Sequence, residues 1–363
     1  MPSSGGTVLA FDAGRLAQAR RLRQMLKSEL AGAIGVTPGA VTQFEAGTTK
    51  PSPATLAKAA LTLGMPAEFF LTGRKSYAVG PDEAHFRALR ATSKRERDGA
   101  RTRIEMLAEL VEFLERYVGL PAIDVPQGLD PRDREGVSEQ LRERWALGRG
   151  PIADMVGVLE RRGVVVARLP ASTDRVDAFS CWVGEKPYVV LTSNKRSADR
   201  SRFDAAHELA HLLFHHDAVP GAKREEGEAQ AFASAFLLPR ESIVAELPSR
   251  PDFPKLIDLK LRWKVSLQAL LRRGNDLGVY SDAAYRRAMT RISAAGWRMR
   301  EPGDVGRPEE PIVLRRAVSM IREHSADARR GLDERLAVGE RNAKELLAMV
   351  DADRTAGSLV SAG

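Results

Sequence analysis

Cysteine is nearly absent from this sequence, which contains only Cys181. A single thiol forms no disulfide within the chain and builds no zinc site from cysteine ligands, so both arrangements are excluded. Cys181 lies in an apolar segment, and we expect it to be a small, half-buried side chain without chemistry of its own.

Long apolar runs are missing as well. No stretch reaches the ~18–20 apolar residues that a membrane span requires, and the first residues lack the pattern of a signal peptide. We therefore expect a cytoplasmic protein with no membrane partner. Basic residues outnumber acidic ones, and the net charge of +8 favours an anionic partner without showing that this partner is nucleic acid.

The most informative motif is His207-Glu208-Leu209-Ala210-His211. The surrounding run, 202–215, has helical apolar spacing and no glycine or proline, which predicts a helix. Residues four apart lie on one helix face, roughly 6 Å apart along the axis, so both imidazoles can bind one Zn²⁺ at about 2.0–2.1 Å. Glu208 would then act as general base on a water molecule whose pKa zinc lowers toward about 7. The competing interpretation is an amphipathic helix with solvated histidines.

A second helix is predicted downstream, because residues 225–239 set carboxylates ahead of a long apolar run. Packed beside the first helix, it would offer one glutamate as a third ligand and leave a fourth position open for water. His215 continues the same face as His207 but lies about 12 Å away along the axis, so one metal cannot bind both. We expect His215 to contact substrate, to support the ligands or to lie on the surface.

The N-terminal part, residues 11–71, reads as a bundle of short helices, expected at 15–26, 27–34, 38–46 and 53–63. Two of them, joined by a tight glycine turn, are typical of a helix-turn-helix, with Thr42 and Gln43 directed at base edges. The alternative is a helical docking module with solvated charges. The residues predicted to contact DNA are Lys27, Thr37, Thr42, Gln43 and Lys50.

The middle of the chain predicts a short sheet ahead of the metal helix, with strands at 164–169, 178–183 and 188–191. Such a sheet would support the site, and an edge strand would accept an extended peptide. Residues 72–100 look like a linker that holds an ordered island at 85–90 and a charge run at 94–98. Further helices are expected at 101–119, 138–145, 152–162, 254–274, 281–295 and within 315–350.

The N-terminal segment resembles the Cro/cI-type (Xre-like) repressor domain. The matching residues are Glu29-Leu30-Ala31, Ile34-Gly35-Val36, Val41-Thr42-Gln43-Phe44-Glu45-Ala46-Gly47, Lys50-Pro51-Ser52-Pro53 and Leu63-Gly64-Met65-Pro66. The second helix of that family usually opens with Thr-Gln, where this sequence has Leu26-Lys27. A helix cap and a phosphate contact are therefore missing or replaced.

Residues 152–239 resemble the ImmA/IrrE family of metallopeptidases. The resemblance rests on Pro187-Tyr188-Val189-Val190-Leu191, on Arg202 with the motif Ala206-His207-Glu208-Leu209-x-His211, and on Glu226-x-x-Ala229-x-x-Phe232-Ala233 up to Leu237-Leu238-Pro239. The resemblance implies zinc ligands at His207, His211 and Glu226, with Glu228 less favoured. It also implies Glu208 as catalytic acid/base, and it sets Gln230 one helical turn after Glu226, where it would support that ligand.

These patterns predict an α+β, mainly α, fold: a helix-turn-helix bundle, a zincin-like domain with a small sheet and an HExxH helix, and a helical C-terminal region. The expected divisions are 11–71 (helix-turn-helix), 72–100 (linker), 101–150 (helical connector), 151–280 (metallopeptidase domain), 281–350 (C-terminal helices) and 351–363 (disordered tail).

The expected function is a DNA-binding transcriptional regulator fused to a zinc endopeptidase. The family implies cleavage of a repressor protein in response to stress or mobile-element signals. The expected partners are double-stranded DNA, a repressor-type protein substrate and a second copy of the chain, because helix-turn-helix proteins bind paired half-sites. The alternative is a regulator whose peptidase-like domain is a non-catalytic sensor or dimerisation module.

Overall fold

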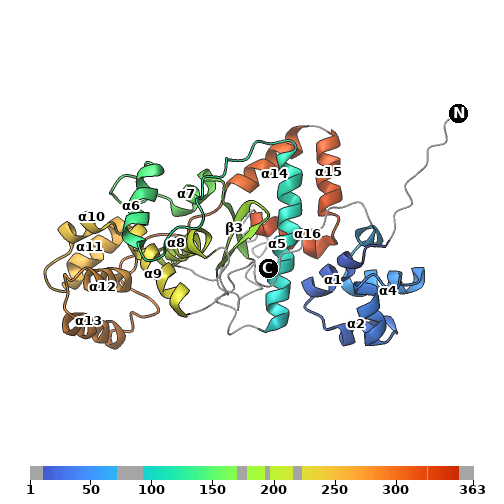
Figure 1. Cartoon of the computed structure of the whole chain (residues 1–363), viewed down its shortest axis with the longest axis horizontal. Helices are drawn as coiled ribbons and strands as arrows, with labels where there is room; N and C mark the ends of the chain where they lie inside the picture. The colour runs from blue at the N-terminus through green and yellow to red at the C-terminus, as the bar shows by residue number, and fades with distance from the viewer. Residues whose placement is uncertain are drawn as a thin grey trace, which may run out of the picture. The chain divides into compact units, whose positions relative to one another are not determined.

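The computed structural model describes residues 11–71, 93–169, 178–192, 197–215, 223–324 and 326–350 (Figure 1). The ordered island expected at 85–90 and the tail expected at 351–363 lie outside the described residues. The chain divides into two compact units. The first takes in residues 1–81, 89–120 and 313–363, and the second takes in 82–88 and 121–312.

The first unit begins with the helix-turn-helix bundle. Its elements are α1 (Ala13–Leu22), α2 (Lys27–Ile34), α3 (Pro38–Glu45), α4 (Pro53–Leu63) and the 3₁₀ helix η1 (Ala67–Phe70). Two helices begin at a hydroxyl cap followed by proline, since Thr37 Oγ1 accepts from Ala40 N and Ser52 Oγ from Thr55 N. The predicted first helix was too long at its end: Gln24 has φ of 55° and stops α1 at Leu22.

Four further helices complete the first unit: α5 (Lys94–Glu115), α14 (Val313–His324), α15 (Ala326–Leu336) and α16 (Glu340–Val350). The prediction that 94–98 belongs to a linker was wrong. Ser93 Oγ accepts from Glu96 N, and the Glu96 carboxylate accepts from Ser93 N, so a capping box starts α5 ahead of the charge run. Arg15 of α1 is fully buried against Glu109 of α5, at 2.6 Å.

The second unit contains the sheet and the helices around it. Its elements are α6 (Arg134–Arg144), α7 (Met155–Arg161), β1 (Val165–Leu169), β2 (Phe179–Val183), β3 (Lys186–Thr192), α8 (Ala198–Phe214), α9 (Lys223–Leu237), α10 (Arg240–Glu246), α11 (Phe253–Trp263), α12 (Leu267–Asp276) and α13 (Asp282–Ala294). The helices expected between 281 and 350 therefore fall into both units. The predicted fold class, α+β and mainly α, is confirmed.

The sheet has the order β1-β3-β2. Tyr188 of β3 pairs with Val165 in the parallel direction and with Cys181 in the antiparallel direction, so β3 is the central strand of the part of the sheet that the structure describes. The three expected strands are confirmed with small shifts at their ends. Cys181 is fully buried and not half-buried, because both faces of this small sheet are covered.

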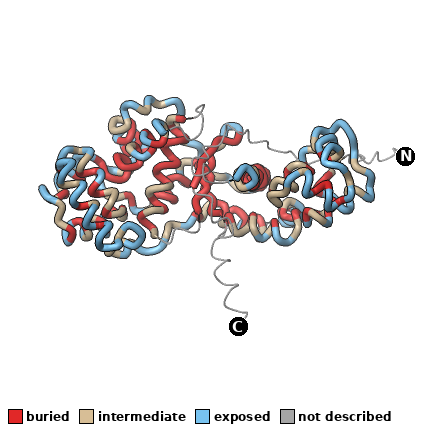
Figure 2. Tube along the Cα trace, turned by 90° about the horizontal axis from the view of Figure 1, so that it is seen from below, coloured by how far each residue is buried: buried red, intermediate tan, exposed pale blue. Residues whose placement is uncertain are grey.

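Helices α8 and α9 pack closely on each other, and α8 also packs on β2 and β3. Part of their contact is apolar: Phe232 of α9 is stacked on Phe236 and meets Phe214 of α8 edge to face, at 5.3 Å between ring centroids. Figure 2 shows buried residues in the interior of each unit and exposed residues on the outer loops. None of the described helices has the length and apolarity needed to cross a membrane.

Candidate metal centre

Helix α8 carries the HExxH motif and extends four residues further toward the N-terminus than predicted. Its i, i+4 geometry brings the Nε2 atoms of His207 and His211 to 3.1 Å from each other. Both imidazoles are buried, so they are not the solvated histidines of the competing interpretation.

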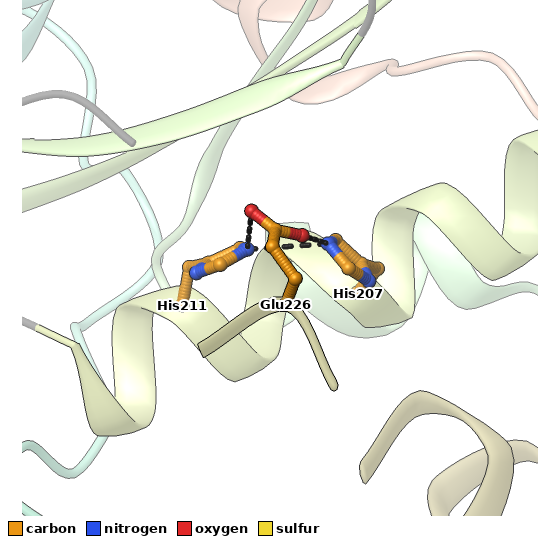
Figure 3. A group of neighbouring side chains, drawn as sticks. All are labelled: His207, His211 and Glu226. Carbon is orange, nitrogen blue, oxygen red and sulfur yellow. Dashed lines mark hydrogen bonds and ion pairs between the residues drawn. The ribbon is translucent and has the colours of Figure 1, made fainter. Parts of the chain in front are cut away.

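Glu226, in the first turn of α9, completes the cluster (Figure 3). Its Oε2 lies 3.3 Å from His207 Nε2 and its Oε1 lies 3.8 Å from His211 Nε2. One ligand atom from each of the three residues lies within 4.8 Å of the others. Two imidazole nitrogens and one carboxylate oxygen form a donor set that zinc takes in catalytic sites, so the residues fit this metal.

Glu208 lies on the side of α8 that faces the sheet. Its Oε2 accepts a hydrogen bond of 2.7 Å from Ser180 Oγ on strand β2. Burial raises the pKa of the Glu208 carboxyl to about 7, although the neighbouring His207 and the Ser180 hydroxyl act in the opposite direction. A carboxyl group with this pKa can both take up and release a proton near neutral pH.

Ser180 was not predicted as a site residue. The available signal was a hydroxyl side chain inside an otherwise apolar strand. Because its hydrogen bond stabilises the carboxylate, we expect Ser180→Ala to raise the pKa of Glu208 further above 7 in chelator-treated protein. ¹³C NMR of glutamate-labelled protein measures this pKa, and Glu208→Gln identifies the signal. An unchanged titration in Ser180→Ala would show that the hydroxyl does not act on this carboxylate.

His215 and Glu228 lie behind the cluster. His215 is only 4% exposed, so the surface position left open for it was wrong. Its Nδ1 lies 3.0 Å from His211 Nδ1, and its Nε2 lies 3.0 Å from Glu228 Oε2. Burial alone would raise the pKa of Glu228, but hydrogen bonds from Arg224 and His215 bring it below its ordinary value.

Gln230, which was expected to support Glu226, is exposed. It lines a hollow beside α8, together with Phe203, Asp204, Gly227 and Ser234. Glu226 and Glu228 contact different residues. Glu226 lies with His207 and His211, whereas Glu228 lies with His215 and Arg224.

The predicted DNA-contacting side chains lie on α2, at the N-cap of α3, on α3 itself and in the following loop. Thr37, Thr42, Gln43 and Lys50 are exposed, and Lys27 is half-buried. Lys27 Nζ lies 3.4 Å from Thr42 Oγ1 and 3.5 Å from Glu45 Oε2. The face of α3 that carries Thr42 and Gln43 is therefore open within the first unit.

The pair Leu26-Lys27, which stands where the family usually has Thr-Gln, changes the hydrogen bonds at the start of α2. The Leu26 side chain cannot accept a hydrogen bond, and the Glu29 carboxylate instead accepts from Leu26 N at 2.6 Å. This bond lowers the pKa of Glu29. Glu29, the third residue of α2, thus satisfies the backbone N–H of Leu26, but it does not replace the side-chain acceptor that a threonine cap would offer to the first turn. Lys27 remains as the basic side chain at this helix end.

The folds and side chains described so far define a helix-turn-helix protein that also carries a metallopeptidase-like domain. Two family models match the chain. Residues 16–70 match the helix-turn-helix family, and residues 159–275 match the family described as the IrrE N-terminal-like domain (peptidase family M78). The predicted combination of the two domains is confirmed. A search of the curated proteins finds no match.

Proposed function

We propose that this protein is a DNA-binding transcriptional regulator whose second unit is a zinc endopeptidase acting on a repressor-type protein. The observation that carries the proposal is the position of Glu208. It is a buried carboxyl group of raised pKa next to two imidazoles and a second carboxylate, that of Glu226, which together fit zinc. A purely structural zinc site has no use for such a group, because four protein ligands close it.

In this proposal His207, His211 and Glu226 hold the metal. Zinc, when bound, supplies a Lewis acid for the scissile carbonyl and a water molecule of lowered pKa. Glu208 would act as the general base and acid, taking up one proton at its carboxylate and passing it to the leaving amine, and Ser180 holds this carboxylate toward the sheet.

Metal content tests the site directly. We expect equimolar zinc in the purified wild-type protein and a large loss of zinc in Glu226→Gln, because an amide is a poor substitute for the carboxylate ligand. Glu225→Gln is the matched control: Glu225 neighbours Glu226 on α9, is not one of the three clustered ligands, and should leave the zinc content unchanged. Elemental analysis gives the ratio. A wild-type protein that takes up no zinc when it is offered would exclude the endopeptidase.

We also propose that the first unit binds double-stranded DNA as a homodimer in the cytoplasm. Thr42 and Gln43 would contact base edges, and Lys27 and Lys50 would contact phosphates. Support comes from the open face of α3 and from the match to the helix-turn-helix family.

The two kinds of contact give different results on duplexes selected from a random-sequence pool. Gln43→Ala is expected to weaken binding of the selected sequence by about 1–3 kcal/mol and to relax base preference. Lys50→Ala should weaken all sequences alike and reduce the salt slope by about 1. Lys255→Ala, exposed in the second unit, serves as control. Binding isotherms at several salt concentrations measure both effects, and an unchanged base preference in Gln43→Ala would remove Gln43 from the recognition surface.

A further inference from the structure

A continuous chain of buried polar groups leads away from the metal cluster. It starts at His211, whose Nε2 faces His207 and Glu226 and whose Nδ1 lies 3.0 Å from His215 Nδ1. His215 Nε2 lies 3.0 Å from Glu228 Oε2, and His211, His215 and Glu228 are each less than 9% exposed. The first unburied group is Arg224, whose Nε donates to Glu228 Oε1 at 2.8 Å.

The positions of the protons in this chain follow from its metal-binding end, His211. A His211 whose Nε2 binds a metal carries its proton on Nδ1 and donates it outward. His215 Nδ1 must then be the acceptor, which leaves the His215 proton on Nε2. That proton is directed at Glu228, a carboxylate that only accepts. Every hydrogen bond in the chain therefore has one donor and one acceptor in a single arrangement.

We infer that His215 and Glu228 are positioning residues, which act through His211 by fixing its metal-binding tautomer and the orientation of its ring. The inference rests on the proposed zinc site. It gives Glu228 a task different from that of the ligand Glu226, although the two stand only two residues apart on α9. Arg224 holds the second oxygen of Glu228 and so keeps the accepting oxygen on His215.

Loss of His215 or Glu228 should lower the zinc affinity by more than a packing defect alone would, because the alternative tautomer of His211 carries a proton on the nitrogen that must bind zinc. In metal sites, loss of the group that orients a ligating histidine typically costs 10–100-fold in metal affinity. We expect a loss of this size for His215→Phe, because phenylalanine fills the space of the imidazole ring but cannot accept the hydrogen bond from His211. Glu228→Leu should give a similar loss, because it leaves His215 Nε2–H without its carboxylate.

Conservative variants separate this role from a structural one. His215→Gln and Glu228→Gln each keep an oxygen acceptor and should recover much of the affinity lost in the apolar variants. Gln230→Ala is the matched control on α9, since its exposed side chain lies in the neighbouring hollow. Competition of the full-length protein with a zinc chelator of known affinity measures all of them. Equal zinc affinity in wild type, His215→Phe and Glu228→Leu would overturn the positioning role of His215 and Glu228 while leaving the zinc site intact.

A measurement on the wild-type protein avoids variants that fail to fold. Long-range ¹H–¹⁵N spectra of the zinc-loaded protein should show His211 protonated on Nδ1 and His215 protonated on Nε2 only. A proton on His215 Nδ1 would overturn the inference, because that nitrogen could not accept from His211. A wild-type protein that binds no zinc would overturn the proposed endopeptidase together with the positioning role of His215 and Glu228. That result differs from a failure of the positioning role alone, in which the wild type still binds zinc.

Discussion

Replacing Glu208 with glutamine is expected to lower peptide cleavage by about 10²–10⁴-fold and to leave zinc content at the wild-type level. Glutamine keeps the size of the side chain and an oxygen that can accept from Ser180 Oγ. Its amide cannot take the proton from water, so the base step is lost while the ligands His207, His211 and Glu226 remain. The combination of retained zinc and lost cleavage is specific to a base that is not a ligand.

The measurement uses zinc-loaded protein and a peptide library whose products are read by mass spectrometry. Glu185→Gln is the matched control, because Glu185 is exposed in the turn between β2 and β3 and should leave cleavage unchanged. Cleavage by Glu208→Gln at the wild-type rate would remove Glu208 from the mechanism. Zinc binding without cleavage by the wild type would favour the alternative, in which this domain is a non-catalytic sensor or dimerisation module.

The features that depend on residues close together in the sequence, such as helical periodicity and helix caps, could be predicted from the sequence. His207 and His211 are four residues apart on a run with helical periodicity, so one helix necessarily brings them to one face. The caps at Thr37 and Ser52, each followed by proline, located the starts of α3 and α4. Glu226 is different, because the family resemblance selected it and the packing of α9 on α8 brought it to the histidines.

The contacts that were missed join residues far apart in the chain. Ser180 and Glu208 are separated by 28 positions, and Arg15 and Glu109 by 94. No periodicity encodes such pairs, because they depend on how complete elements pack. The wrong prediction at the start of α5 concerned a local feature. The sequence contains the Ser93–Glu96 capping box, but the charge run after it was interpreted as a linker.

Helix α8 is also supported by a long-range contact that no local sequence pattern predicts. Lys260 of α11 is 2% exposed, and its Nζ lies 2.7 Å from Asp199 Oδ2 and 2.8 Å from Glu301 Oε2. Asp199 stands in the first turn of α8, and Glu301 also accepts from the backbone N–H of Leu267 at the start of α12. One buried ammonium group thereby links three helices of the second unit, including the helix with the HExxH motif.

Lys260→Met is therefore expected to destabilise the second unit by about 3–5 kcal/mol, because methionine fills the space but leaves two buried carboxylates without a cation. Lys255→Met is the control: Lys255 is exposed on the same helix, and its loss should change stability by less than about 0.5 kcal/mol. Scanning calorimetry is suited to the comparison, since a chain with two compact units need not unfold in one step.

The pH dependence identifies the carboxylates as the origin of the effect. Burial alone would raise the pKa of Asp199, but hydrogen bonds from Lys260 and Ser197 bring it below 3.8. An acid whose pKa is lower in the folded state contributes stability above its unfolded value, and this contribution is lost as the pH falls through the folded pKa. The difference between wild type and Lys260→Met should thus be largest at neutral pH and shrink below about pH 4. A difference that stays constant down to acidic pH would instead assign the loss to packing of the Lys260 side chain.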